Sequence, residues 1–285
     1  MSMGAPLGFV PLDQLEDVCE LLSADGPSVH LLGGGTSRPI ADCLLLVDLQ
    51  RVEALGGLGE DAQGRLHLGA TLRLGEVAKN EILRRRARLL ALACGQLGHK
   101  QWRRRATLAG VLIGAGSSGG LWPALDCLDA VAVLRSRDGG RSLAIRGSQA
   151  REWRALLTPD ELVESLRVPI RRGRQLSLHA VNDGGRGPIL ALLARRHRDG
   201  SLSRVRIAFG GGPESDLARE AEALLTEGAI DEARVLSWGR MLLDAWPGDG
   251  VRQVVGEVQQ GLLAHVEHMR VLRLRRRRRA KRRAG

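Results

Sequence analysis

Helical and extended segments alternate over roughly the first hundred residues. After Pro11, apolar residues recur every three or four positions, which predicts a helix with one buried face. Short uninterrupted apolar runs predict buried strands, and strict alternation predicts a half-buried one. These segments are a helix at 12–22, strands at 29–32, 44–49 and 65–70, and helices at 72–83 and 87–97. The succession indicates a mixed α/β unit with short connections.

The second half of the chain begins with a hairpin. The sequence RDGG at Arg137–Gly140 lies between two apolar strands, and aspartate and glycine accept the positive φ angles of a tight turn. A strand at 161–169 ends in proline, and the polar joint RRGRQ follows it, so we place a domain boundary after residue 172. The remaining segments are an apolar stretch at 189–194, a strand at 204–211 and helices at 216–225, 230–245 and 251–269. They predict a small α+β domain over 173–269.

Composition and charge separate a near-neutral body from a basic tail. The chain has 285 residues, of which 44% are hydrophobic, and carries a formal net charge of +11. Ten basic residues and no acidic one lie between Arg270 and Gly285, which leaves only +1 for residues 1–269. We expect this tail, residues 270–285, to be disordered or a frayed extension of the last helix beyond Leu274. With five Trp, two Phe and no Tyr, the body lacks stacking platforms, so binding of nucleic acid is expected only non-specifically, through the tail.

The sequence does not favour a membrane protein, a metalloprotein or a disulfide-stabilised protein. No uncharged apolar run has the length of a membrane span, and the first residues lack a basic segment before an apolar one. The four cysteines lie far apart and form no CxxC pair, so we interpret them as buried thiols in a reducing cytoplasm. The cysteines are Cys19, Cys43, Cys94 and Cys127. The histidines show no spacing of the HExxH kind.

Two glycine-rich segments carry the candidate chemistry. The first, LLGGGTS at Leu31–Ser37, follows a strand, and its glycines allow a ligand to approach the backbone N–H groups closely. The second, within Arg103–Ala130, places glycines among apolar residues and predicts a compact buried loop. Together they could hold the pyrophosphate of a dinucleotide from two sides. Neither matches the P-loop or the spaced GxGxxG pattern, so a tight turn and an ordinary long loop are equal alternatives.

The order of five segments identifies a resemblance. FVPLDQLEDVCELL, GGGTS, LLLVDLQRVEAL, LHLGATLRLGEVAKNEIL and LGHKQWRRRATLAG follow one another in the chain. This succession resembles the flavoprotein (medium) subunit of molybdenum hydroxylases such as xanthine dehydrogenase and carbon monoxide dehydrogenase, and the FAD subunits linked to selenium-dependent hydroxylases. The resemblance covers residues 9 to about 170 and continues more weakly over 176–269. It implies an α+β fold, with a two-subdomain FAD-binding domain followed by a small α+β C-terminal flavoprotein domain.

The resemblance also implies the positions of an FAD site. The first loop would bind the pyrophosphate, and the second segment matches the TIGGN or TIGGS motif of the family. Further positions correspond to a ribose-binding carboxylate, an apolar contact of the flavin, and a lysine near the ring. In that order, the implied residues are Leu32, Gly33, Gly34, Gly35, Thr36 and Ser37; Thr107, Leu108, Ala109, Gly110 and Val111; Gly120; Val163; and His179.

The function implied by this resemblance is electron transfer within a cytoplasmic oxidoreductase complex. FAD would receive electrons from a 2Fe–2S partner subunit, which serves a molybdopterin catalytic subunit, and would pass them to NAD+ or another acceptor. No protein nucleophile or acid–base pair stands out, which is compatible with a flavin that carries the chemistry itself. Ala109, Val111 and Gly120 depart from the motif. Two alternatives therefore remain: a flavin-free structural or assembly homologue, and a nucleic-acid-associated protein acting through its arginine tail.

Overall fold

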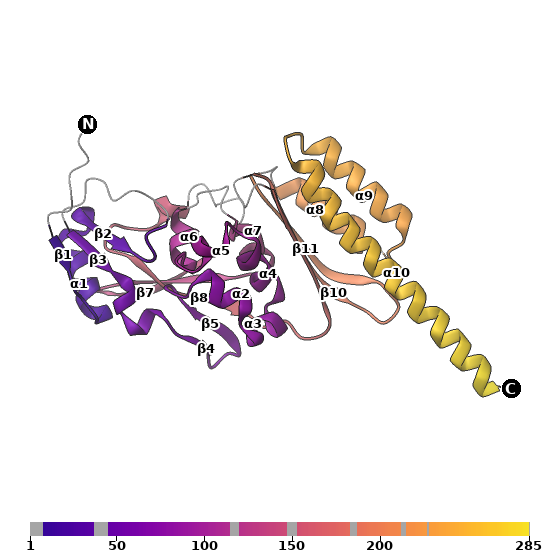
Figure 1. Ribbon diagram of the computed structural model, residues 1–285, viewed down its shortest axis with the longest axis horizontal. Helices are drawn as coiled ribbons and strands as arrows, with labels where there is room; N and C mark the ends of the chain where they lie inside the picture. Colours follow the sequence, from indigo (N-terminus) through magenta and orange to yellow (C-terminus); the bar gives the residue numbers. More distant parts are fainter. Residues whose placement is uncertain are drawn as a thin grey trace.

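Three sheets follow one another along the molecule, each with its own helices (Figure 1). The computed structural model describes residues 8–36, 45–114, 120–146, 153–182, 187–211, 215–226 and 228–284. Among these residues, no helix is both long and apolar enough to cross a membrane. The chain is mixed α+β, as the sequence predicts.

The first sheet is small and parallel. Strand β3 (Leu45–Asp48) lies between β1 (Gly8–Val10) and β2 (Val29–Leu32), and pairs in parallel with both. Helix α1 (Leu15–Asp25) contributes Val18 to a core shared with the central strand. The predicted helix and the two strands of this region are confirmed, although Val47 is the only buried residue of β2 and β3, and the glycine loop lies directly at the end of β2.

The second sheet has five antiparallel strands in the order β4-β5-β8-β6-β7. The hairpin that Arg137–Gly140 predicts is confirmed, since its two strands pair across that turn. The strands are β4 (Leu58–Glu60), β5 (Arg65–Gly69), β6 (Val131–Ser136), β7 (Gly139–Ala144) and β8 (Leu162–Pro169). Strand β8 is central, so the segment just before the interdomain joint is anchored on both sides.

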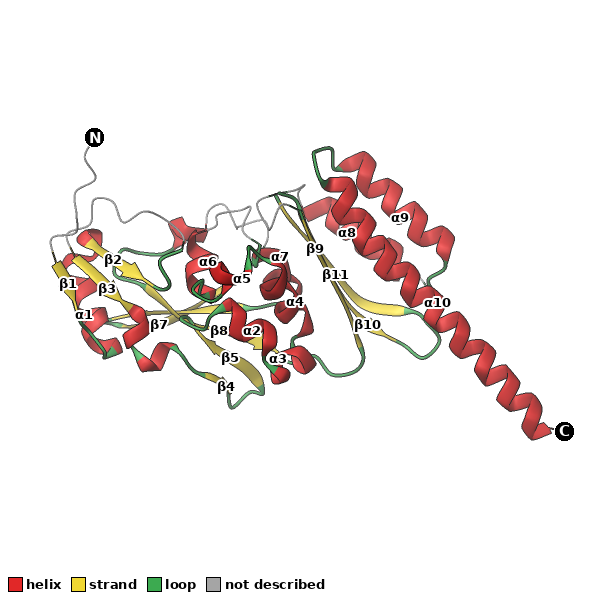
Figure 2. Cartoon of the chain, viewed as in Figure 1, coloured by secondary structure: helices red, strands yellow, loops and turns green. Residues whose placement is uncertain are grey.

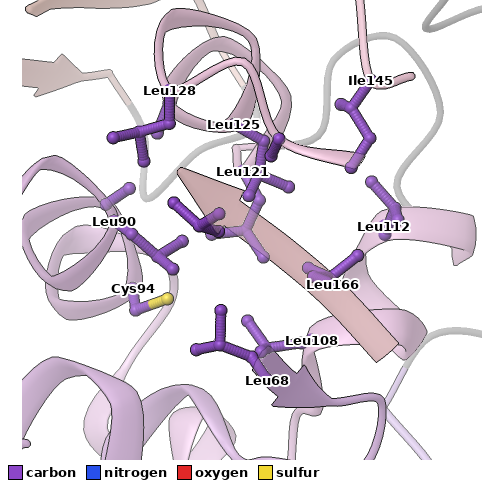
Figure 3. Close-up of a cluster of buried hydrophobic side chains, with 14 of the residues drawn as sticks. Leu68, Leu90, Cys94, Leu108, Leu112, Leu121, Leu125, Leu128, Ile145 and Leu166 are labelled. Atoms are coloured by element: carbon purple, nitrogen blue, oxygen red, sulfur yellow. The ribbon is translucent and has the colours of Figure 1, made fainter. Parts of the chain in front are cut away.

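Six short helices accompany this sheet, and most of the largest core cluster lies between them and its strands (Figure 3). The predicted helix at 72–83 is split at Asn80, whose side chain accepts hydrogen bonds from the N–H groups of Ile82 and Leu83, 2.9 and 3.2 Å away. The helices are α2 (Leu74–Lys79), α3 (Glu81–Arg86), α4 (Arg88–Gln96), α5 (Lys100–Arg103), α6 (Leu108–Gly114) and α7 (Trp122–Cys127). The loop that we predicted over 108–114 is thus a helix.

The C-terminal part is an antiparallel sheet in the order β11-β10-β9, covered on one face by three helices (Figure 2). Its strands are β9 (Gln175–Val181), β10 (Ile189–Arg196) and β11 (Leu202–Gly210), and its helices are α8 (Ser215–Thr226), α9 (Glu232–Ala245) and α10 (Val251–Ala284). The predicted strand and the three predicted helices are confirmed, the apolar stretch at 189–194 lies within β10, and β9 was not predicted. Where we expected disorder or fraying beyond Leu274, α10 continues as helix to Ala284.

Strand β10 is buried on both faces. Leu190 and Leu192 pack into the cluster formed with α8, α9 and α10, whereas Ala191 and Leu193 pack into the core of the preceding domain. The facing elements of that domain are α4 and α7. This explains why residues 189–194 are apolar without alternation, since a strand covered on both sides has no solvent face.

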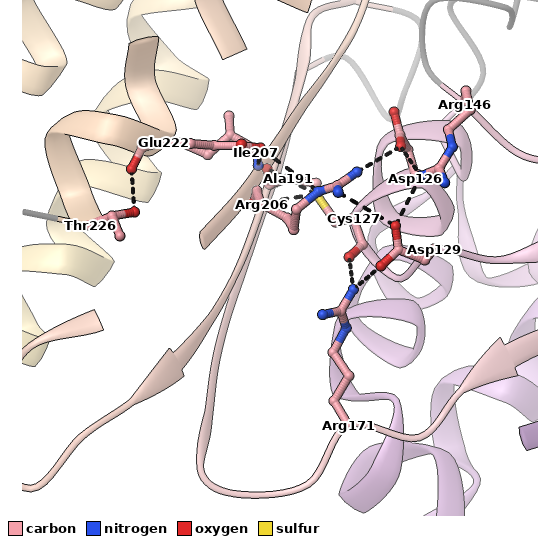
Figure 4. A network of polar contacts seen from close by, with 10 residues as sticks. All are labelled: Asp126, Cys127, Asp129, Arg146, Arg171, Ala191, Arg206, Ile207, Glu222 and Thr226. Atoms are coloured by element: carbon pink, nitrogen blue, oxygen red, sulfur yellow. Dashed lines mark hydrogen bonds and ion pairs between the residues drawn. The ribbon is translucent and has the colours of Figure 1, made fainter. Parts of the chain in front are cut away.

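A polar network joins the same two parts (Figure 4). Arg206 of β11 lies 3.5 Å from carboxylate oxygens of both Asp126 and Asp129, at the end of α7. Asp129 also pairs with Arg146 at 2.9 Å and with Arg171 from the interdomain joint. Burial raises the pKa of Asp129, but the hydrogen bond from Arg146 and the neighbouring arginine charges outweigh it and lower that pKa below its usual value.

Candidate functional site

The glycine loop packs directly against the backbone that precedes α6. A Cβ atom at Gly34 would overlap the carbonyl oxygen of Arg105, so only glycine allows this approach. A Cβ atom at Gly33 would lie 2.6 Å from the hydroxyl oxygen of Thr107. Gly35 has a φ of +64°, which L-residues rarely adopt. The first and second sequence motifs are therefore in contact, as a shared site requires.

The N–H groups of this loop are available to a ligand. Within the described ranges, none of the four N–H groups from Gly33 to Thr36 donates a hydrogen bond. Gly35 is exposed and the other three residues are half-buried. Consecutive free N–H groups in a turn form a partial positive charge that suits an anion such as a pyrophosphate. The loop therefore fits the diphosphate of a dinucleotide by its geometry.

Arg105 adds a full positive charge beside this loop. Its Nη2 atom lies 3.1 Å from the point where a Cβ of Gly35 would stand, and the residue is exposed. A guanidinium can donate two parallel hydrogen bonds to a phosphate. Sequence reasoning missed this residue, although the run RRRATLAG signals it, because the last arginine stands two positions before the motif threonine.

The second motif is largely occupied with its own structure. The N–H groups of Leu108 and Ala109 donate to the carbonyl oxygens of Leu72 and Ala70, each over 3.0 Å. Thr107 accepts a hydrogen bond from the N–H of Gly110 at 3.2 Å. The remaining motif residue, Val111, is buried in the core, and of the five motif residues only Gly110 is half-exposed. Leu108 and Ala109 therefore have no free N–H for a ligand.

Two of the remaining predicted residues, Gly120 and His179, lie at the interface with the C-terminal sheet, and Val163 lies in the core of the preceding sheet. Gly120 is buried, and a Cβ atom there would overlap the side chain of Leu97, so a carboxylate at this position has no room. Val163 on β8 belongs to the main core and is 2% exposed. Ser37 lies outside the described residues.

His179 is held neutral in this interface. Its Nδ1 lies 2.5 Å from Oε1 of Gln96 on α4, so the tautomer with a proton on Nδ1 donates to that amide oxygen. Burial lowers the pKa of His179 to about 4, an effect that the backbone of Gly120 only partly opposes. The imidazole is therefore uncharged at neutral pH.

No metal site accompanies these residues. Among the described residues, no cluster of three or more His, Cys, Asp or Glu side chains has the geometry to hold a metal ion. Cys19, Cys94 and Cys127 are free and buried, and burial raises the pKa of each thiol. Cys43 lies outside the described part of the chain.

Solved structures with the same fold are oxidoreductases. One chain of quinoline 2-oxidoreductase from Pseudomonas putida 86 superposes with a TM-score of 0.79 at 20% identity, covering 94% of this chain and 99% of that one. One chain of carbon monoxide dehydrogenase from Hydrogenophaga pseudoflava gives a TM-score of 0.74 at 19% identity, with coverages of 94% and 99%. These likenesses establish the fold of the whole chain.

Sequence relatives narrow the class to medium subunits of oxidoreductases. The nicotine 6-hydroxylase medium subunit of Paenarthrobacter nicotinovorans is 27% identical over 204 residues, which are 69% of this chain and 71% of the relative. The glyceraldehyde dehydrogenase medium chain of Sulfolobus acidocaldarius is 22% identical over 210 residues, or 71% and 74%. The family model of the FAD binding domain in molybdopterin dehydrogenase matches residues 7–171. The chain belongs to this family and is an FAD-binding oxidoreductase subunit.

Proposed function

We propose that the chain is the electron-transfer subunit of a molybdenum hydroxylase complex in the cytoplasm. In this proposal, FAD accepts electrons from a 2Fe–2S partner subunit that serves a molybdopterin catalytic subunit. The electrons then pass to NAD+ or to another acceptor. The proposal rests on the family membership together with one observation, the group of free N–H donors at the end of β2.

The FAD pyrophosphate would bind at Gly33–Thr36, with Arg105 neutralising part of its charge. In this proposal, Thr107 and the backbone of Arg105 hold the loop in position and do not themselves donate hydrogen bonds to the pyrophosphate. Gly110 is the half-exposed member of the second motif and would approach the ligand from that side. In this proposal, the first loop supplies the hydrogen-bond donors to FAD, and the second motif holds that loop in position.

The ring end of the FAD would lie toward the interface with the C-terminal sheet. Gly120 and His179 are buried at that interface and Val163 is buried in the core on β8, so we propose that they shape an apolar wall of the site and do not donate hydrogen bonds to the ring. Neutral His179 adds no cation to that wall. When bound, FAD supplies hydride and single-electron chemistry, and the protein provides binding, orientation and exclusion of water.

The decisive experiment is the flavin content of the purified full-length protein. We expect a yellow protein with about one FAD released per chain, in keeping with one diphosphate site. A colourless protein that binds no added FAD would instead support the flavin-free structural or assembly homologue. Arg105→Gln should weaken FAD binding about tenfold, because a charge-assisted hydrogen bond is lost. Arg104→Gln, one residue away and also exposed, is the matched control and should leave the affinity within about twofold.

A further inference from the structure

A cationic hollow of about 400 Å³ lies in the C-terminal domain. It is formed where the interdomain joint, the end of β10 and the hairpin after it meet helix α10. The hollow combines cationic and apolar side chains: it is lined by Arg174, Arg195, Arg196 and Arg198, by Gly173 and His197, and by Met269 and Leu272 of α10. Neither the family match over 7–171 nor the proposed FAD site includes this feature.

Three of the arginines that line the hollow have no ion-pair partner among the described residues. Among the described residues, no carboxylate pairs with the side chains of Arg174, Arg195 or Arg196. The neighbouring carboxylate of Asp199 is engaged by Ser201, whose N–H and hydroxyl donate to it over 3.0 and 2.7 Å. Three guanidinium groups without a partner around one hollow attract an anion with more than one negative charge.

Helix α10 extends this positive surface. Arg270, Arg273 and Arg275 are exposed on the turns next to the hollow. Seven more basic residues follow on the same helix between 276 and 283, and the only apolar residues from Arg275 to Ala284 are two alanines. A protein partner needs an apolar interface core, which this stretch cannot supply, whereas a polyphosphate needs only charge. The observations thus favour a phosphate polymer over an acidic protein.

We propose that the hollow and the adjoining part of α10 bind the phosphodiester backbone of a single-stranded nucleic acid without sequence preference. The hollow takes a nucleotide whose phosphate meets the arginines and whose sugar and base lie on Met269 and Leu272. An unpaired strand can turn a base into such a hollow, and guanidinium planes can stack on it. A duplex keeps its bases stacked inside and offers only its phosphates.

The test uses the full-length protein and a fluorescent oligothymidylate of about 20 nucleotides. Binding is measured by anisotropy between about 50 and 200 mM salt. The pocket variant Arg174→Gln/Arg195→Gln removes two exposed cations from the hollow. The matched control, Arg84→Gln/Arg88→Gln, removes two exposed cations from the FAD-binding domain.

Direct contact predicts a specific change in salt dependence. Each lost phosphate contact lowers the slope of log K against log salt by about 0.7 for single strands, so the pocket variant should lose about 1.4. Its affinity at low salt should fall about tenfold, while the control variant stays within about twofold. Equal losses in the two variants would mean that only long-range attraction acts, and would overturn the proposed pocket.

Two further measurements isolate the hollow and the chemistry of its ligand. A chain truncated after Leu274 should bind more weakly but still respond to the pocket substitutions; loss of all binding in that chain would overturn the role of the hollow.

Tripolyphosphate should compete at lower concentration than polyglutamate of equal charge, and equal competition would overturn the preference for phosphate. Flavin content should be unchanged throughout, so failure here is separable from failure of the proposed FAD site.

Discussion

Gly35 combines a positive φ angle with a place in the proposed pyrophosphate loop, so a substitution there should affect both stability and FAD binding. Its φ of +64° makes Gly35→Ala a strained substitution, costing about 1 kcal/mol of stability. The relaxing backbone would also reorient the free N–H groups of the loop, so we expect FAD affinity to fall at least about tenfold. Titration of the flavin-free protein with FAD measures this.

The matched control for Gly35 is Gly64, which has a φ of +71° in the turn between β4 and β5. Gly64→Ala should cost similar stability, because it imposes the same backbone strain. Its FAD affinity should equal that of the wild type. If both variants lose affinity alike, general destabilisation and not the loop geometry accounts for the loss.

Buried His179 should make stability depend on pH. Its pKa is about 4 in the folded chain and 6.5 as a reference, so the unfolded chain binds more protons between these values. The stabilisation is fully present above pH 6.5 and is lost as the pH falls toward 4, by up to about 3 kcal/mol. Urea unfolding at several pH values should show this loss in the wild type and a smaller one in His179→Gln. The exposed His268→Gln should behave like the wild type.

At the scale of elements, Asn80 shows how one side chain divides a helix. Its amide oxygen caps α3 while its extended backbone ends α2. Asn80→Ala should therefore cost about 1 kcal/mol, a fall in Tm of roughly 2–4 °C for a chain of this size. Asn80→Asp retains a capping oxygen and should stay near the wild-type Tm. Equal melting of the two variants would show that the cap contributes nothing.

Most elements could be predicted from periodicity, and the failures have local physical causes. The apolar pattern continues through 72–83, so only the capping preference of Asn80 could have revealed the break. Helix α6 was missed because its glycines lower helix propensity, whereas burial of Leu108, Val111 and Leu112 compensates for that cost. Tertiary burial of this kind is not visible in a single sequence.

The candidate site was predictable only in part for a related reason. The glycine loop could be found because three glycines and two hydroxyl residues follow a predicted strand, and glycine permits close approach to the backbone. That the N–H groups of Leu108 and Ala109 are already bonded depends on Ala70 and Leu72, almost forty residues earlier. Arg105 was likewise one of three adjacent arginines, and only the packing of Gly34 and Gly35 distinguishes it.

At the scale of the whole molecule, Arg206 links the two domains electrostatically. Arg206→Gln leaves Asp126 and Asp129 with fewer positive neighbours, so we expect a lower Tm at neutral pH. Arg204→Gln, on the same strand but exposed, should leave the Tm nearly unchanged. Because the folded pKa of Asp129 is lowered, its contribution is present above the reference value of 3.8 and is lost below it. The difference between the variant and the wild type should therefore shrink in acid.

Because β10 is buried on both faces, the order in which the chain is synthesised affects its folding. The segment that matches the family model ends at residue 171, but the strands that cover α4 and α7 are complete only at Gly210. At a synthesis rate of about 5–20 residues per second, this gap of roughly forty residues takes about 2–8 s. During that interval the apolar surface that will meet Ala191 and Leu193 has no cover. The nascent chain is then most open to aggregation and to capture by chaperones, and a slow codon in this stretch would prolong that exposure.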